Sequence, residues 1–407
     1  MNESSLKVSI NGFRFAGVSC GIKPKTAAYG GRALDLALIV SDQPCSVAGV
    51  FTQNRFPAAP VLYDKGAIQA NPTGMRAVVI NSGNANACTG AQGEVDALRM
   101  AKVAENALGL AAGTALVMST GVIGVALPMD EIEAGIGEAS DQARSSTGQS
   151  REGQMLAAQA IMTTDTQPKL AMHRVGSATI LGLAKGAAMI HPNMATMLAA
   201  VVTDAAVEPD ALHPMLRRAV DRSFNAITVD GDTSTNDTML VLANGLAGPV
   251  DAGAFEAALT GVCQDLAQQI VRDAEGGTKF VAVRVTGATS EDQARQVAKT
   301  IATSVLVKTA VYGGDPNWGR VLAAAGRSGV ELDPSLCALW FAGDGGSEFQ
   351  VVTGGTPLAY DEAEAARIFA CHDLTIHLDL GAGEAEATVW TSDLTHEYVT
   401  LNAHYRT

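Results

Sequence analysis

The sequence predicts an α/β fold in which sheets are layered with helices. Helical and strand patterns alternate along the 407 residues, and the strand patterns are of two kinds. The continuous apolar run at 77–80 is typical of a strand buried on both faces, whereas the alternation over 374–380 is typical of a strand with one solvated face or of an edge strand. Both kinds, mixed with long helices, favour layered sheets over a plain parallel barrel.

Five segments carry apolar residues at helical spacing. The first ends just before Gly109, a residue that commonly closes helices. In the last, Thr289 and Asp292 stand at capping-box spacing, which predicts a helix start at Thr289. The polar, Ser-rich residues 140–151 are expected to form an exposed loop. The expected helices cover residues 94–108, 151–162, 210–223, 254–273 and 289–302.

Short segments rich in Val, Ile, Leu and Ala predict the strands. No internal repeat or low-complexity linker divides them, and the Gly-rich residues 343–346 lack the spacing of a dinucleotide site, so they predict a turn. The expected strands cover residues 77–80, 115–118, 197–202, 239–242, 280–285, 338–342, 374–380 and 387–390.

The composition indicates a soluble globular protein. Hydrophobic residues make up 47% and charged residues 17%, and the length allows about two or three domains. No apolar run is long enough to span a bilayer, and a net charge of −14 disfavours nucleic acid and anionic membranes as partners. Residues 1–5 have no basic flank and no apolar core, so we expect no secretory signal and a cytoplasmic location.

Cysteine and metal-ligand patterns favour neither disulfides nor a bound metal. The six cysteines lie far apart without a C-x-x-C pair, which indicates reduced thiols; a nucleophilic role for Cys88 is conceivable but disfavoured. Residues 230–237 lack the Gly and Glu positions of a calcium loop, and no H-E-x-x-H or phosphate-binding loop occurs. We expect neither a metal nor a cofactor.

The Ala195–Thr196 junction carries the most specific chemistry in the sequence. Small residues leave this peptide bond open to attack. If it breaks, Thr196 becomes a chain start that carries a hydroxyl nucleophile beside an α-amine base, which is one known form of activated nucleophile. On spacing alone, an ordinary buried strand entered through a Pro-Asn turn is an open alternative.

Residues 194–198, preceded by Lys185 and Gly186, resemble the autoprocessing site of the ornithine acetyltransferase family. Further similar segments follow the family's order from Phe51 to the end of the chain. These segments are 51–54, 81–87, 119–124, 163–166, 230–237, 273–276, 314–320 and the tail from residue 398. By this resemblance, which covers nearly the whole chain, the sequence is identified as a member of that family.

The resemblance implies a fold, a reaction and an assembly. The fold is a layered α/β sandwich that resembles the N-terminal nucleophile hydrolases but has a distinct topology. Autocatalytic cleavage would give an α chain, 1–195, and a β chain, 196–407, which stay one intertwined unit and assemble as two α and two β chains. The implied reaction of arginine biosynthesis moves acetyl from N2-acetyl-L-ornithine to L-glutamate, and bifunctional members also use acetyl-CoA.

The resemblance also implies roles for individual residues. Thr196 is the nucleophile, and Thr120 with Gly121 is the oxyanion hole. From the residues alone, 120–121 could equally be a plain turn that follows a strand. The residues implied in substrate binding are Thr163, Lys185, Thr196, Glu275, Asn402 and Thr407.

Charge suggests which group of the substrate each binding residue contacts. Our hypothesis is that Lys185 binds the substrate carboxylate and Glu275 its distal ammonium. Without the resemblance, a solvated turn lysine and an exposed acid at a helix end are the ordinary interpretations. Asn402 lies near the end of the chain, where segments are usually mobile, so the tail must be pinned; Tyr398 and Leu401 packing inward would do so.

Residues 187 and 188 depart from the family pattern. Many members have Ser-Gly where this chain has Ala187-Ala188. A Cβ at Ala188 restricts the backbone near the cleaved bond, and Ala187 offers no hydroxyl, so this departure bears on the rate of processing but not on the nucleophile. Two other functions remain open: a hydrolase with the same nucleophile, such as an aminopeptidase or amidase, and a binding protein that never cleaves.

Overall fold

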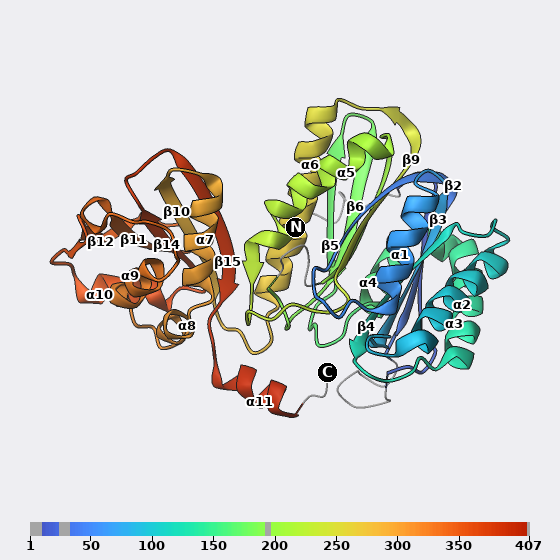
Figure 1. The fold of residues 1–407 in the computed structure, drawn as a ribbon, viewed down its shortest axis with the longest axis horizontal. Helices are drawn as coiled ribbons and strands as arrows, with labels where there is room; N and C mark the ends of the chain where they lie inside the picture. Colours follow the sequence, from blue (N-terminus) through green and yellow to red (C-terminus); the bar gives the residue numbers. More distant parts are fainter. Residues whose placement is uncertain (1–9, 24–32, 192–196, 405–407) are drawn as a thin grey trace.

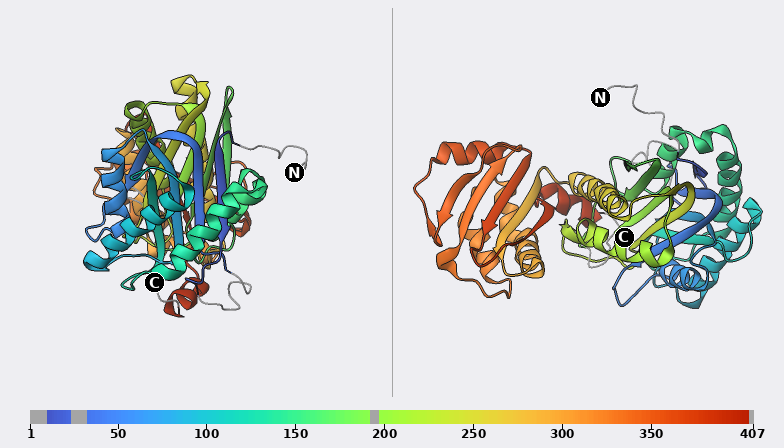
Figure 2. Two further views of the ribbon diagram at one scale, coloured as in Figure 1. Left: turned by 90° about the vertical axis from the view of Figure 1, so that its right-hand side faces the viewer. Right: turned by 90° about the horizontal axis from the view of Figure 1, so that it is seen from above.

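The computed structural model describes residues 10–23, 33–191 and 197–404. Two sheets form two lobes that lie side by side, each with helices packed on its sheet (Figure 1, Figure 2). Apart from the short strand β8 (Ile227–Thr228), which joins the second sheet, the chain builds the first lobe up to about residue 275 and then the second. A last helix extends back beneath the gap between them. The predicted layered α/β class is confirmed.

The first lobe is built on a mixed sheet of eight strands among the described residues. Its long strand β2 pairs with β3 through its first half and with β9 through its second half, so it joins the two parts of the sheet. In spatial order the strands are β4 (Ala115–Val122), β3 (Met75–Asn84), β2 (Leu36–Phe51), β9 (Thr238–Pro249), β7 (Leu198–Ala206), β6 (Ala178–Lys185) and β5 (Lys169–Val175), with β1 (Phe13–Val18) paired to β2.

Helices cover both faces of this sheet because both faces are apolar. Alternate residues of β7 and β9 pack against α5 and α6 on one side, while the residues between them join a second core that includes α4. A further cluster packs α2 and α3 on β2, β3 and β4. The helices are α1 (Ala59–Ala70), α2 (Gly90–Leu108), α3 (Met129–Arg144), α4 (Arg151–Ala160), α5 (Pro209–Asp221) and α6 (Ala252–Arg272).

The second lobe has a sheet of seven strands among the described residues, and one apolar cluster forms its core. In spatial order the strands are β13 (Thr356–Pro357), β12 (Phe349–Thr353), β11 (Ala338–Gly343), β14 (Asp373–Asp379), β10 (Phe280–Ala288), β15 (Ala385–Ser392) and β8 (Ile227–Thr228). The helices are α7 (Glu291–Ala302), α8 (Val305–Tyr312), α9 (Trp318–Gly326), α10 (Glu362–Ala370) and α11 (His396–His404). Single 3₁₀ turns lie at Ser146–Gln149, Phe224–Ala226 and Pro334–Leu336.

The predicted elements are present, with shifted ends. Residues 77–80 are fully buried within β3, and β14 alternates between buried and half-buried residues, as their patterns predicted. Gly109 closes α2 in a left-handed conformation. No described helix is long and apolar enough to cross a membrane.

Two local predictions are wrong. The expected loop over 140–151 is largely helical, because α3 continues to Arg144 and buries Ser140, whose hydroxyl donates to the Ile136 carbonyl. The helix expected to start at Thr289 starts at Glu291 instead. Its N-cap is Ser290, whose Oγ accepts the Gln293 N–H at 3.3 Å.

Candidate active site

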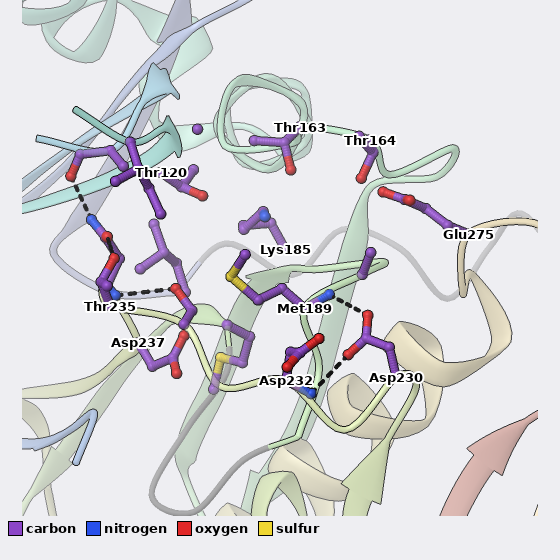
Figure 3. Close-up of a pocket in the computed structure, with 18 of the residues that line it drawn as sticks. Thr120, Thr163, Thr164, Lys185, Met189, Asp230, Asp232, Thr235, Asp237 and Glu275 are labelled. Carbon is purple, nitrogen blue, oxygen red and sulfur yellow. Dashed lines mark hydrogen bonds between the residues drawn. The ribbon is translucent and has the colours of Figure 1, made fainter. Parts of the chain in front are cut away.

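A cavity of about 260 Å³ opens where several first-lobe strands end. Figure 3 shows residues of its walls from the end of β4, the end of β6, the loop before β9 and the segment after α6. The start of β7 and α11 complete the lining. Polar side chains dominate this lining and come from segments far apart in the sequence. They are Thr120, Thr163, Thr164, Lys185, Asp230, Asp232, Ser234, Thr235, Asn236, Asp237, Glu275, Tyr398 and Asn402.

The structure brings together the residues for which the sequence predicted a role, as far as it describes them. Six of them line this one cavity: Thr120, Gly121, Thr163, Lys185, Glu275 and Asn402. Ala195, Thr196 and Thr407 lie outside the described residues. Met197, which follows Thr196 in the chain, lines the same cavity. These six residues therefore share one cavity, while their individual roles stay predictions.

Thr120 and Gly121 lie within β4 and not in the predicted turn. The strand continues to Val122, and Gly121 pairs with Gly83 of β3. Gly121 has a φ of 131°, and a Cβ there would lie 2.3 Å from the Gly83 carbonyl carbon. Only glycine permits this close strand approach, which sets Thr120 on the cavity wall.

Lys185 is the last residue of β6 and is not a solvated turn lysine. It is 9% exposed, and its side chain lies between Thr120 on one side and Glu275 on the other (Figure 3). No described residue forms a hydrogen bond or ion pair with its ammonium. Burial lowers the pKa of Lys185, and nearby carboxylates partly oppose that shift. A cation in this position suits an anionic group of a ligand.

Asp165 ties the two sides of the cavity together. Its Oδ1 accepts hydrogen bonds from Lys169 Nζ and from the Gly186 N–H, both at 2.6 Å, and its Oδ2 accepts the Thr163 N–H at 2.9 Å. Burial alone would raise the pKa of Asp165, but the charges of Lys169 and Lys185 and these hydrogen bonds hold it at about 2. The carboxylate therefore stays charged and fixes both backbone segments.

Lys169 extends this network to the segment that carries Glu275. The lysine is 1% exposed, and its Nζ lies 2.6 Å from Asp273 Oδ2. Asp273 also accepts the Thr166 N–H at 3.0 Å and the Gln167 N–H at 3.3 Å. These buried ion pairs fasten the loop after α4 to the end of α6, two residues before Glu275.

Glu275 connects the first lobe to α11 through a hydrogen bond. It is 9% exposed, so the interpretation as an exposed helix-end acid is wrong. Its N–H donates to the Ala187 carbonyl at 3.0 Å, and its Oε2 accepts the Asn402 Nδ2–H at 2.9 Å. One carboxylate oxygen thus pins Asn402.

The approach of α11 depends on Gly276. A Cβ at Gly276, where φ is 63°, would lie 2.5 Å from the Tyr398 nitrogen. Thr395 Oγ donates to the Gly276 carbonyl at 2.7 Å, and the Tyr398 hydroxyl reaches Asp230 at 3.3 Å. Tyr398 therefore helps to pin the tail as predicted. Leu401 does not pack inward, because it is 41% exposed.

Asp230 holds the backbone that leads toward the Ala195–Thr196 bond. It accepts the Met189 N–H at 2.6 Å (Figure 3) and the Ile190 N–H at 2.9 Å. Met189 has a φ of 55°, a conformation that costs energy for a residue with a side chain and persists because its surroundings fix it. Before it, Ala188 lines the cavity, whereas Ala187 is buried behind it.

Sequence reasoning missed three aspartates that shape the site: Asp165, Asp230 and Asp237. All three line cavities at this site, and two of them fix backbone N–H groups of distant segments. The sequence did carry a signal for these aspartates, because each lies in a segment rich in Gly or Thr that resembles the family. No group of three His, Cys, Asp or Glu side chains among the described residues is arranged to hold a metal ion.

A family model described as ArgJ family matches residues 14–407. The chain belongs to the ArgJ family. This confirms the family that the motifs indicated, and with it the expectation of an enzyme.

Curated relatives match this chain over almost its whole length. A Symbiobacterium thermophilum protein named arginine biosynthesis bifunctional protein ArgJ is 50% identical, with 97% of each chain covered. A Thermotoga neapolitana protein of the same name is 46% identical, covering 97% of this chain and 99% of its own. A solved structure described as Mycobacterium tuberculosis ornithine acetyltransferase complexed with ornithine is 37% identical, with a TM-score of 0.39, covering 47% of this chain and 97% of its own.

Proposed function

We propose that this protein is a glutamate N-acetyltransferase of arginine biosynthesis. It transfers acetyl from N2-acetyl-L-ornithine to L-glutamate and releases L-ornithine and N-acetyl-L-glutamate. The observation that carries the proposal is the cavity itself, which sets a cation, Lys185, and a carboxylate, Glu275, on either side of a space that suits a zwitterionic amino acid. The names of the relatives support the pathway.

The reaction proceeds in two halves through an acetylated threonine. Thr196 Oγ attacks the acetyl carbonyl while the α-amine of Thr196 takes the hydroxyl proton. Hydrogen bonds from Thr120 and Gly121 stabilise the oxyanion. The C–N bond then breaks, and ornithine leaves with that proton on its nitrogen. In the second half the glutamate amine attacks the ester carbonyl, the bond from that carbon to Thr196 Oγ breaks, and the α-amine of Thr196 passes the glutamate amine proton to Oγ. If the enzyme is bifunctional, the same threonine also takes the acetyl group from acetyl-CoA, and coenzyme A leaves as the free thiol.

Cleavage between Ala195 and Thr196 activates the enzyme in this proposal, because an amide nitrogen is no base. The products are an α chain, 1–195, and a β chain, 196–407, with two of each in the assembly. Strand pairing supports one intertwined unit: β6 of the first part pairs with β7 of the second, and β2 pairs with β9. Thr163 and Asn402 bind substrate together with Lys185 and Glu275, and Thr407 is proposed with them from the resemblance.

Ping-pong kinetics are expected, because one nucleophile holds the acetyl group between two amine partners. Mixing with acetylornithine alone should add one acetyl group to the 196–407 fragment, detected by intact mass. Initial-rate lines should be parallel when both substrates are varied. Intersecting lines together with an unacetylated fragment would sink the mechanism.

The Glu275→Gln variant should bind acetylornithine more weakly, since only this substrate carries a distal ammonium. Losing a hydrogen bond to a charged group costs about 1.5–3 kcal/mol, so KM for acetylornithine should rise roughly ten- to hundredfold. KM for glutamate should change much less. Glu397→Gln, an exposed acid at the start of α11, is the matched control. Equal increases in both KM values would contradict the division of roles.

Two observations separate the competing functions. A hydrolase with the same nucleophile would pass the acetyl group to water, so glutamate must outcompete water for the acetyl-enzyme. A binding protein that never cleaves would run as one band near 41.8 kDa on a denaturing gel.

A further inference from the structure

Asn236 is a polar residue of the cavity wall whose side chain the proposed reaction does not use. It lies on the loop before β9 and is 5% exposed, and it lines the same cavity as Thr120. Figure 3 shows Thr120 and Thr235, the residue before Asn236, at the same end of that cavity. The hydrogen bonds of the Asn236 carboxamide indicate what this residue does there.

Both N–H groups of the Asn236 carboxamide donate to backbone carbonyls. Nδ2 donates to the Ser119 carbonyl at 2.8 Å and to the Ala85 carbonyl at 2.5 Å, and Oδ1 accepts the Thr235 hydroxyl at 2.7 Å. A carboxamide has only two donor hydrogens, so none is left for a substrate. The two carbonyls also fix which way round the amide lies, because its oxygen would be repelled there. Asn236 therefore holds the protein backbone and does not bind the reacting groups.

The two carbonyls that it holds flank the segment formed by Thr120 and Gly121. Ser119 directly precedes Thr120 in β4, and because a peptide group is planar, holding the Ser119 carbonyl also fixes the nitrogen and Cα of Thr120. The Ala85 N–H donates at 3.0 Å to the carbonyl of Val122, the residue after Gly121. One carboxamide thus holds β4 just before this segment and, through Ala85, just after it.

Strand β4 needs such support because it lies at the edge of its sheet. Among the described strands only β3 pairs with it, so side chains must satisfy its other edge. Asp64 Oδ1 accepts the Val117 N–H at 2.9 Å, and Asn236 holds Ser119, one residue before Thr120. A hydrogen-bond donor stabilises a transition state only if its position is fixed beforehand, to within about 0.5 Å.

The loop that carries Asn236 is itself fixed by the segment after β2. The Ala58 N–H donates to the Thr235 carbonyl at 2.9 Å, and the Thr52 hydroxyl donates to the Ser234 carbonyl at 2.8 Å. The Asn236 N–H in turn donates to Ser234 Oγ at 3.1 Å. The carboxamide therefore stands on a rigid support, as a residue that positions another must.

We propose that Asn236 is the positioning residue for the oxyanion hole: its carboxamide holds the end of β4 so that Thr120 is aimed at the developing oxyanion before substrate binds. This rests on the proposed function, which makes Thr120 an oxyanion donor. Asn236 touches no reacting atom, and no covalent bond to it forms or breaks. Because Asn236 belongs to 196–407 and Thr120 to 1–195, the same contact joins the two proposed chains at the site.

The test compares Asn236→Ala with Asn244→Ala in cleaved protein. Misplacing a catalytic group by about 1 Å costs up to about a hundredfold in rate, so kcat of Asn236→Ala should fall about ten- to hundredfold with little change in KM. Asn244, on β9, is the matched control, because its carboxamide also binds a distant backbone group, the Asn11 carbonyl at 2.9 Å, but does not line the cavity. Asn244→Ala should keep the wild-type kcat.

A double-mutant cycle shows whether Asn236 acts through Thr120. If it does, Asn236→Ala should reduce kcat much less in the Thr120→Ala background than in the wild type, because the hydroxyl that it positions is already gone. Losses that multiply, a wild-type kcat per folded Asn236→Ala molecule, or a rise in KM alone would overturn the proposal. A wild-type kcat in Thr120→Ala would overturn the oxyanion role in the proposed function as well, so the two failures are distinguishable.

Two comparisons keep the test decisive when folding or cleavage fails. Asn236→Asp keeps the side-chain volume but cannot donate to both carbonyls, so it should show the same loss of kcat if Asn236→Ala does not fold. If neither variant folds, the residue serves the fold and the proposal is wrong. If a folded Asn236 variant stays uncleaved, Thr120→Ala should cleave equally slowly, and rapid cleavage of Thr120→Ala would contradict the proposal.

Discussion

The Thr196→Ala protein is expected to remain one chain of 41.8 kDa and to transfer no acetyl group. The substitution removes the hydroxyl that, in the proposed mechanism, attacks both the Ala195–Thr196 bond and the acetyl donor. Without cleavage the α-amine stays an amide nitrogen, so nucleophile and base are lost together. Removing such a unit abolishes nearly all turnover. A denaturing gel, intact mass and an acetyl-transfer assay measure both effects.

Thr196→Ser is the matched control, because it keeps a hydroxyl beside the amine. It should still give two fragments and measurable transfer. N-terminal sequencing of the wild-type fragments provides the decisive check. A second fragment that starts at any residue other than Thr196 would refute the assignment.

Thr120→Ala should lower kcat about 10²–10³-fold with little change in KM. An oxyanion donor acts mainly in the transition state, and losing one costs about 2.7–4 kcal/mol of barrier. The position of Thr120 on the cavity wall, beside the glycine that lets β3 and β4 approach, supports this role. The rate must be measured on protein that is already cleaved, since autolysis passes through a similar oxyanion.

Thr120→Ser keeps the hydroxyl and should retain most of the activity. A purely structural Thr120 would give a different outcome, with a lower melting temperature but normal turnover per folded molecule. If cleaved Thr120→Ala protein turns over substrate as fast as the wild type, Thr120 is not an oxyanion donor.

Sequence patterns predicted the helices and strands in which buried residues recur at a regular spacing. Residues 77–80 and 374–380 became strands of the expected kinds because each pattern depends on the strand's own two faces. Helix α3 was missed because its apolar face, which includes Ile132 and Ile136, is interrupted by small and polar residues. The buried face of α3 can be recognised only in the folded structure, where β1 and β2 pack against it.

The candidate site also contains some residues that the sequence could predict and others that it could not. Lys185 and Glu275 could be proposed from their charge and from motif resemblance. Asp165 and Asp230 could not, because each also accepts a backbone N–H that lies 21 or 41 residues away, and such a group can belong to any residue type. Such carboxylates are recognised only once the strand ends meet around one cavity.

The pairing of β6 with β7 across residues 186–197 has a consequence for the thermodynamics of the mature enzyme. Six residue pairs join the two strands on either side of the proposed cut, so folded protein loses no strand pairing when the connection opens. The unfolded state changes completely, since it becomes two separate molecules that gain translational freedom. Stability of the mature form therefore depends on protein concentration, whereas that of an uncleaved protomer does not. If the proposed cleavage takes place, dilution therefore destabilises each cleaved protomer, an effect that a single uncleaved protomer does not show.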